Sequence, residues 1–364
     1  MMVPPYAPEI GSMRIGIAGP PFSGKTTLFR AVTGLDPDPA RSGDPAGVVG
    51  LVPVPDPRLD HLSAVFRPRK HTPARLEFVD FPGLEPGVEG ERKRQILARL
   101  REMDALLLVF DAFSGEGSPA AALAAWELLK MDFLFSDLEI LGKRIEKLRS
   151  GAAKPTRTQE AERRELELLD RVRGEAERRG TLSGIRLEPA EDKILRGFSL
   201  LSPKPSLVVL NEKDPPCGEL PPVVRDRCPG AIRLSAQLER EIAELPSSER
   251  GPFLEGLGIE EPASHRMVRE VYRLLGLISF FTTGEDECRA WTVRAGDDVV
   301  TAAGRIHSDL ARGFIRAEVY SYESFRELGS EGAVKARGRI RTEGRDYIVK
   351  DGDVLTILFN TGGR

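Results

Sequence analysis

The residues with the clearest chemical potential lie in the segment GPPFSGKTTL at positions 19–28. Gly19 and Gly24 have the Gly-x4-Gly-Lys-Thr spacing that lets successive backbone N–H groups turn toward phosphate oxygens. In such a loop Lys25 reaches the β- and γ-phosphates, and the Thr26 hydroxyl is a ligand for Mg2+. The spacing therefore predicts a binding site for a nucleoside triphosphate.

The surroundings of this segment favour the same interpretation. The run RIGIAG at residues 14–19 has strand length, and a helical pattern of apolar residues continues to Gly34. A helix that begins directly after such a loop directs its positive end at a bound anion. The residues predicted to bind phosphate are Gly19, Pro20, Pro21, Phe22, Ser23, Gly24, Lys25, Thr26, Thr27 and Gly83.

Gly83 belongs to a second motif, EFVDFPGL at residues 77–84. Asp80 and Gly83 have the Asp-x-x-Gly spacing of a nucleotide switch, in which the carboxylate holds Mg2+ through water and the glycine N–H senses the γ-phosphate. This spacing is common by chance, so its meaning comes from its place at a strand end after the phosphate loop. We predict Mg2+ as the cofactor, bound by Thr26 and Asp80.

Two further motifs predict how a purine base is held. VVLNEKD at residues 208–214 gives Asn211 and Asp214 the Asn-x-x-Asp spacing, in which a carboxylate accepts the two N–H donors of the guanine Watson–Crick edge. Adenine offers no such pair of donors. RLSAQ at residues 233–237 is expected to close on the base, and Glu212 stands where many GTPases have a Lys that stacks on it. The predicted base-binding residues are Asn211, Glu212, Asp214, Ser235, Ala236 and Gln237.

Bulk properties exclude several other classes of protein. A length of 364 residues suggests two or three domains, and a net charge of -3 argues against a strongly basic nucleic-acid binder. The three cysteines, Cys217, Cys228 and Cys288, fit neither a disulfide framework nor a zinc site. Residues 1–12 lack the pattern of a signal peptide, and no window approaches the ~20 apolar residues of a membrane span. We expect a cytoplasmic monomer without a membrane partner.

Strand-length apolar runs alternate with helical patterns over most of the chain before residue 280. They are RIGIAG, GLVPV, RLEFVDF, ALLLVFD and PSLVVLNE, and they predict an α/β fold with a mostly parallel sheet. From residue 279 onward, short strands around one or two helices predict a small α+β module.

The alternation is interrupted between about residues 131 and 200. One helical stripe comprises Phe135, Leu138, Ile145 and Leu148, and a second comprises Leu166, Leu169, Val172 and Ala176. The helix-breaking segment SGAAKPT separates them, so we predict an inserted helical hairpin. Residues 143–179 carry twelve Lys or Arg against eight Asp or Glu, which fits either a nucleic-acid contact or an ordinary solvated face.

Several long segments resemble the YchF proteins, an Obg-related branch of the translation-factor class of P-loop NTPases. The similar segments are GLVPVPDPRLDHL, RLEFVDFPGL, IAELPSSERGPFLEGLGIEEP, RAWTVRAGDDVVTAAGRIHSDLARGFIRAEVYSYESF and EGRDYIVKDGDV. The resemblance implies an α/β P-loop NTPase G domain (residues 13–130 and 201–278), an inserted α-helical coiled-coil hairpin (131–200) and a C-terminal β-grasp TGS domain (279–364). It also implies nucleotide hydrolysis and association with ribosomes or RNA.

Three departures from the family pattern bear on activity. YchF proteins usually have Glu in place of Asp214 and accept ATP as well as or better than GTP, so Asp214 favours GTP. The stretch SGDPAGVVGLV at residues 42–52 contains no switch threonine. Leu84 replaces the water-positioning Gln of other GTPases, as in the family, and Leu108 stands at the place of a catalytic His. The nearby candidates to replace that group are Glu85, Glu89 and Glu91, and no spacing argument selects one.

Two hypotheses follow. The first is an NTPase that binds GTP, and also ATP, hydrolyses it slowly and acts on the ribosome or RNA as a translation-linked or stress-linked switch. The second is a ribosome- or RNA-binding adaptor with a degenerate, non-hydrolysing nucleotide site. The missing switch threonine and Leu108 favour the adaptor, whereas the phosphate loop and Asp80 favour the enzyme. A nucleotide kinase is a third class, opposed by the base motifs and the TGS-like end. The catalytic residues remain unassigned.

Overall fold

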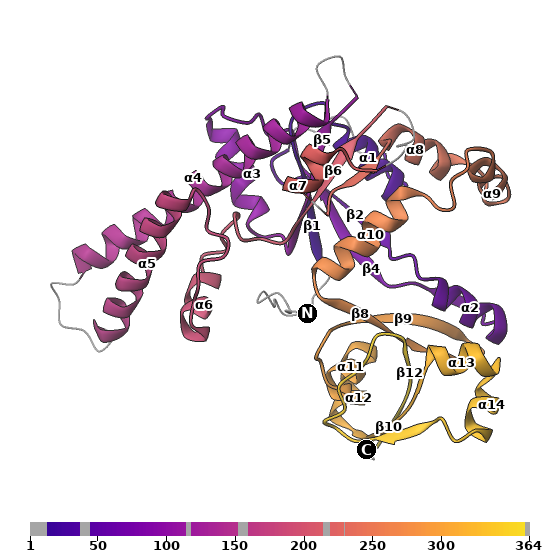
Figure 1. Cartoon of the computed structure of the whole chain (residues 1–364). Coiled ribbons are helices and arrows are strands. Elements are labelled where there is room, and N and C mark those ends of the chain that lie inside the picture. Colours follow the sequence, from indigo (N-terminus) through magenta and orange to yellow (C-terminus); the bar gives the residue numbers. More distant parts are fainter. Residues whose placement is uncertain are drawn as a thin grey trace.

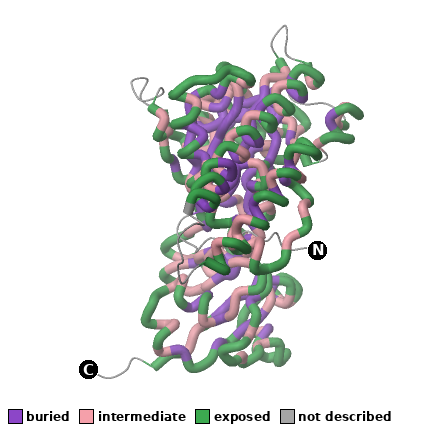
Figure 2. Tube along the Cα trace, turned by 90° about the vertical axis from the view of Figure 1, so that its left-hand side faces the viewer, coloured by how far each residue is buried: buried purple, intermediate pink, exposed green. Residues whose placement is uncertain are grey.

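The computed structural model describes residues 13–36, 44–113, 118–151, 159–213, 219–228 and 230–360, to which the following statements apply. Figure 1 shows three regions: an α/β domain at the top, a helical arm that extends to the left, and a smaller module below. In Figure 2 the buried residues gather along the middle of the upper domain, so the main core lies between its sheet and the helices that cover it.

The α/β domain is built on a six-stranded sheet in the order β2-β4-β1-β5-β6-β7. All neighbouring strands run parallel except β2, which is antiparallel to β4. The strands are β1 (Arg14–Ala18), β2 (Val48–Pro53), β4 (Arg75–Asp80), β5 (Ala105–Asp111), β6 (Ser206–Asn211) and β7 (Ile232–Leu234). Each of the five predicted apolar runs overlaps a strand of this sheet, which confirms the α/β fold.

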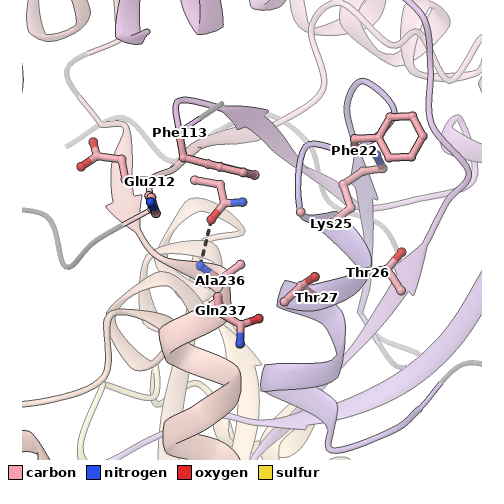
Figure 3. A pocket seen from close by; sticks show the side chains of 11 residues that line it. Phe22, Lys25, Thr26, Thr27, Phe113, Glu212, Ala236 and Gln237 are labelled. Carbon is pink, nitrogen blue, oxygen red and sulfur yellow. Dashed lines mark hydrogen bonds between the residues drawn. The ribbon is translucent and has the colours of Figure 1, made fainter. Parts of the chain in front are cut away.

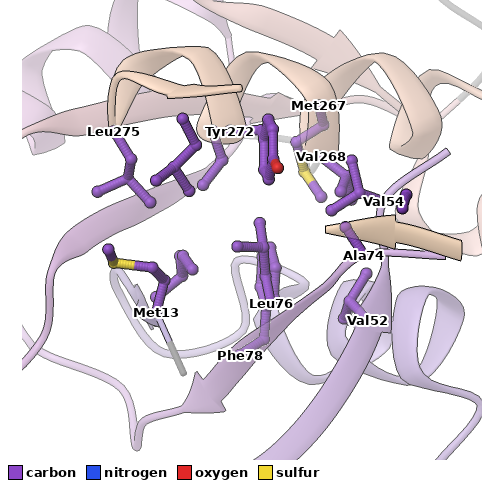
Figure 4. Packing of buried hydrophobic residues seen from close by; sticks show 14 of the residues in the cluster. Met13, Val52, Val54, Ala74, Leu76, Phe78, Met267, Val268, Tyr272 and Leu275 are labelled. Carbon is purple, nitrogen blue, oxygen red and sulfur yellow. The ribbon is translucent and has the colours of Figure 1, made fainter. Parts of the chain in front are cut away.

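Helices cover both faces of this sheet, and the strand sequences reflect it. In β5, Leu107 and Val109 join the core on one face, whereas Leu106 and Leu108 join the core on the other, as expected for a strand buried on both sides. Figure 4 shows α10 packed over β2 and β4 in the core that contains Leu107 and Val109, which we call the first core. The helices of this domain are α1 (Lys25–Thr33), α2 (Pro57–Phe66), α3 (Glu91–Leu100), α7 (Pro222–Arg227), α8 (Ala236–Glu244), α9 (Ser247–Gly256) and α10 (Ala263–Leu274).

The arm consists of α4 (Pro119–Gly151), α5 (Gln159–Arg179) and α6 (Pro189–Arg196). α4 and α5 share an apolar core, which agrees with the predicted pair of helices. Two details differ from the prediction. The expected start of the insertion, residue 131, lies inside α4, whose first turns pack on the α/β domain. Phe135 was assigned to the inner stripe but is 59% exposed, because its neighbour Leu134 occupies the core position instead.

The C-terminal module is a second six-stranded sheet in the order β11-β10-β12-β8-β9-β3. β12 runs parallel to β8, and β8 and β9 are antiparallel. The strands are β3 (Lys70–Thr72), β8 (Leu277–Thr282), β9 (Glu287–Arg294), β10 (Phe314–Ser321), β11 (Arg341–Glu343) and β12 (Asp353–Phe359), and the helices are α11 (Val299–Ile306), α12 (Ser308–Arg312), α13 (Tyr322–Leu328) and α14 (Glu331–Ala336). The α+β pattern agrees with the prediction, and the TGS assignment stays a prediction.

An unexpected feature is how residues 57–72 join the two sheets. β3 lies in the sequence between β2 and β4 of the α/β domain, but it pairs in parallel with β9 of the C-terminal module. Arg58 of α2 forms an ion pair with Asp351, with Nη1 2.8 Å from Oδ2. The first core also continues from the α/β domain into α13. The expected boundary at residue 279 therefore divides the chain into two segments, but the side chains of these segments pack into one continuous core.

Three other expectations concern single residues or the whole chain. Asp214 and Cys217 lie outside the described residues. Cys228 and Cys288 are free cysteines. Within the described ranges, every helix is too short or too polar to cross a membrane.

Candidate functional site

The predicted phosphate loop connects β1 to α1 at the carboxyl end of the central strand, and its glycines are required by space. Gly19 has a φ of +148°, and a Cβ there would lie 2.1 Å from the Val109 carbonyl oxygen. Gly24 has a φ of +89°, and a Cβ there would lie 2.1 Å from the Asn211 Nδ2. Any larger side chain at either position would collide with these atoms and strain the backbone, so steric constraints explain why the motif has glycine at both positions.

Beside this loop is a cavity of about 610 Å³, which is in the size range of small-molecule sites. Figure 3 shows how its walls come from α1, α8 and the ends of β5 and β6. Its lining residues are Phe22, Gly24, Lys25, Thr26, Thr27, Phe113, Asn211, Glu212, Lys213, Ala236 and Gln237. The structure thus brings five of the predicted phosphate residues and four of the predicted base residues to one cavity. The predicted residues that are described but do not line it are Gly19, Pro20, Pro21, Ser23, Gly83 and Ser235.

Lys25 supplies a buried positive charge to this cavity. The residue is 5% exposed, and its Nζ donates to the Pro20 carbonyl oxygen at 2.5 Å. Burial lowers the pKa of Lys25 to about 8, against the opposing effect of the Asp80 carboxylate. A phosphate group at this position would bring the negative charge that a buried ammonium needs.

Thr26 and Asp80 form the second polar pair. The Thr26 hydroxyl donates to Asp80 Oδ2 at 2.7 Å, whereas Asp80 Oδ1 is buried without a hydrogen-bond partner. Burial raises the pKa of Asp80, and the Thr26 hydrogen bond and the Lys25 charge oppose this rise. A carboxylate oxygen left free beside a hydroxyl is a donor set that fits Mg2+, which takes oxygen ligands and retains waters.

Asn211 joins the two halves of the cavity. Its Nδ2 donates to the Ser23 carbonyl oxygen at 3.1 Å, and its Oδ1 accepts from the Ala236 N–H at 2.8 Å. Ser235 caps α8 and donates its hydroxyl to the Lys213 carbonyl oxygen at 3.0 Å. Asn211 therefore holds the base segments against the phosphate loop, whereas Ser235 holds the two base segments together.

The Glu212 and Gln237 side chains are already engaged. Glu212 makes two contacts with Arg233, at 2.5 Å to Nε and 2.9 Å to Nη2. Gln237 donates its Nε2 to Glu241 at 2.7 Å, which fixes the orientation of its amide. Since a carboxylate with two partners is held in place, Glu212 has less freedom to cover a base than the Lys that it replaces.

The switch glycine lies directly against the phosphate loop. A Cβ on Gly83 would lie 2.7 Å from the Pro21 Cα, and the Leu84 N–H donates to the Gly19 carbonyl oxygen at 2.9 Å. Leu84 is 1% exposed and Leu108 is 2% exposed, and both belong to the core. The three candidate replacements for the catalytic group, Glu85, Glu89 and Glu91, are exposed and are absent from the described cavity lining.

Sequence reasoning missed Phe113 and Lys213, which also line the cavity. Phe113 is 41% exposed and follows β5, where the Asp111 carboxylate accepts its N–H at 2.8 Å. Its place just past the carboxyl end of a central parallel strand is the signal that could have identified it. Phe22 was predicted from the motif alone, and it is 96% exposed with a φ of +60°.

The mostly parallel sheet, the loop between β1 and α1, and the cavity at the edge of the sheet define a P-loop protein. The chain belongs to the YchF family. It is 35% identical over 367 residues to the ribosome-binding ATPase YchF of Escherichia coli O157:H7, with 95% of this chain and 99% of that protein covered. It is 34% identical over 369 residues to the ribosome-binding ATPase YchF of Bacillus subtilis strain 168, with 96% and 100% covered.

Two further comparisons agree. The structure of the Schizosaccharomyces pombe YchF GTPase matches with a TM-score of 0.81 at 26% identity, and the match covers 96% of this chain and 99% of that one. The family model YchF-GTPase_C, with the description "Protein of unknown function (DUF933)", matches residues 277–360. The resemblance to YchF proteins in the sequence is therefore confirmed.

Proposed function

We propose that this chain is a cytoplasmic NTP hydrolase that binds GTP, and also ATP, with Mg2+ and works on the ribosome. The observation that carries the proposal is the buried Lys25 ammonium in the wall of the cavity together with Asp80 behind it. Asp80 Oδ1 has no hydrogen-bond partner, and its Oδ2 accepts from Thr26, which lines the cavity. Lys25 suits a triphosphate and Asp80 suits its metal ion. The printed names of the bacterial relatives support the ribosome as the partner.

The chemistry available to the described residues is mainly binding and charge stabilisation. The loop N–H groups and Lys25 would hold the phosphates, and Thr26 with Asp80 would hold Mg2+, which neutralises charge on the β- and γ-oxygens. Positioning of the attacking water and a cationic finger together account for up to ~10^5 in rate in regulated GTPases. Because Leu84 and Leu108 are buried in the core, we expect slow turnover until a partner completes the site.

The choice of base rests on Asp214, for which the sequence argument favours guanine. The curated relatives named above are ATPases, so the two purines must be compared directly. We expect the dissociation constant of GTP to lie below that of ATP in titrations with labelled nucleotides. Asp214→Glu should shift the preference toward ATP. An equal or lower dissociation constant for ATP in the unaltered protein contradicts the role of Asp214.

Phosphate release with and without ribosomes tests the proposal itself. We expect measurable turnover that ribosomes increase by at least tenfold, because the partner supplies the groups that the site lacks. A second candidate function, an adaptor whose nucleotide is only a structural ligand, is favoured by the burial of Leu108. The adaptor predicts tight nucleotide binding with no phosphate release in either condition.

The pKa of Lys25 predicts how nucleotide affinity depends on pH. Since the pKa of Lys25 in the free protein is about 8, the cavity loses the Lys25 charge as pH rises through 8, while a bound triphosphate would keep that proton in place. Affinity should be constant below about pH 7 and should fall by a factor approaching ten per pH unit above 8. Lys25→Arg is the control, because its charge persists over the whole range. A flat profile from pH 7 to 9.5 would exclude a titrating Lys25.

A further inference from the structure

The segment that follows Gly83 has contacts at both ends, one with the phosphate loop and one with the helical arm. At the near end, the Leu84 N–H donates to the Gly19 carbonyl oxygen at 2.9 Å. At the far end, the Gly87 N–H donates to Asp132 Oδ2 at 3.2 Å. Asp132 belongs to α4, which continues from the α/β domain into the arm.

Asp132 is part of an ion pair that is largely shielded from solvent. The same Oδ2 lies 2.7 Å from the Nζ of Lys93 in α3, and the two side chains are only 10% and 9% exposed. Lys93 Nζ also donates to the Glu85 carbonyl oxygen at 3.2 Å. The pair therefore fastens the segment to α4 from two directions, through the N–H of one residue and the carbonyl of another.

The distance along the chain between these contacts is short. Three residue steps separate Leu84 from Gly87, and a fully extended chain covers at most ~11 Å in three steps. Gly83 is exposed to solvent but lies against the phosphate loop, where a Cβ would lie 2.7 Å from the Pro21 Cα. The Val88 N–H donates to the Glu85 carbonyl oxygen at 3.4 Å, so the backbone between the two contacts is a turn. A displacement of Gly83 would therefore reach Asp132 through a single turn of backbone that is fastened at both ends.

We propose that Asp132 is a positioning residue that couples the nucleotide cavity to the orientation of the helical arm. This inference rests on the proposed function, since it takes the γ-phosphate as the group that displaces Gly83. The Asp132–Lys93 pair fixes residues 84–91 so that Gly83 faces the phosphates. Through the same contacts, a displacement of Gly83 moves α4. The arm, which contains α4, therefore changes its orientation when the triphosphate binds.

The test measures nucleotide binding, turnover and arm position on the full chain. A dye pair at the exposed positions Arg178 in α5 and Glu331 in α14, introduced as unnatural amino acids, reports the distance between arm and module. In the unaltered sequence we expect a non-hydrolysable GTP analogue to shift the transfer efficiency. In Asp132→Ala we expect the shift to fall by at least half and the ribosome-stimulated turnover to fall about tenfold. The nucleotide dissociation constant should stay within twofold of that of the unaltered protein. Asp132→Asn, which keeps an acceptor for the Gly87 N–H, should recover part of both.

Two further variants separate positioning from folding. Insertion of Gly-Gly between Glu85 and Pro86 lengthens the segment and leaves the Asp132–Lys93 pair intact, so it should abolish the shift in transfer efficiency. This variant tests the proposal independently of whether Asp132→Ala folds. Glu139→Gln alters an exposed carboxylate of α4 that pairs with Lys143, and it should behave like the unaltered protein. The proposal is wrong if the unaltered protein binds the analogue without a shift, or if the insertion leaves the shift in place. A failure of the unaltered protein to bind nucleotide would instead refute the proposed function.

Discussion

Replacement of Lys25 by alanine is expected to weaken triphosphate binding by at least ~100-fold. The Lys25 ammonium is the buried cation of the cavity and is placed within reach of the β- and γ-phosphates. A hydrogen bond to a charged group contributes about 1.5–3 kcal/mol, and each 1.4 kcal/mol changes a dissociation constant tenfold. Because Lys25 would contact two phosphates, the loss should exceed that of one such bond. Titration with a fluorescent triphosphate analogue measures it.

Two control variants sharpen this test. Lys25→Arg keeps the charge but not the length, so it should retain part of the affinity. Lys143→Ala removes an exposed lysine from the arm, and the dissociation constant should stay unchanged. Lys25→Ala should also weaken the binding of a nucleoside monophosphate less than that of a triphosphate, because the monophosphate has no β- or γ-phosphate. Unchanged triphosphate affinity in Lys25→Ala would remove the central claim about this cavity.

The parts of the site that the sequence predicted are those in which local backbone geometry dictates the residue type. Gly19 and Gly24 have φ angles of +148° and +89°, which residues with a Cβ rarely adopt. Asp80 could be placed because a strand end brings its carboxylate to the edge of the sheet, next to Thr26. In each case the motif and its flanking strand or helix carry the information within a few residues.

Contacts between distant segments were beyond the reach of the sequence. The Glu212–Arg233 pair joins residues 21 positions apart, and the sequence motif that placed Glu212 among the base-binding residues carried no sign of it. The parallel pairing of β3 with β9 joins residues more than 200 positions apart, and a three-residue strand has too little periodicity to be recognised. Phe135 illustrates a third limit: apolar side chains on adjacent positions of α4 point to different faces, and only the packed neighbour shows which one is inside.

Replacement of Asp137 by alanine is expected to lower the free energy of unfolding by about 3–5 kcal/mol. Asp137 lies in α4 and is fully buried. Its Oδ1 accepts from Arg101 Nη1 at 2.6 Å and from the Leu201 N–H at 3.0 Å, and its Oδ2 accepts from the Ser202 N–H at 2.8 Å. Alanine would leave two N–H groups without an acceptor and the Arg101 guanidinium without its counter-charge, although that guanidinium still donates to Ser136 and Ser199. Urea denaturation followed by helical circular dichroism measures the change.

The matched control is Asp170→Ala in α5. Asp170 also pairs with an arginine, Arg149, but their side chains are 41% and 61% exposed, so the loss should stay below about 1 kcal/mol. Arg101→Met combined with Asp137→Ala should cost less than the sum of the two single changes, because no unpaired charge remains buried. Asp137 joins α4, the end of α3 and the returning chain at residues 201–202, which is the point where the arm meets the α/β domain. A shift under about 1 kcal/mol in Asp137→Ala would mean that apolar packing, rather than this carboxylate, fixes the base of the arm.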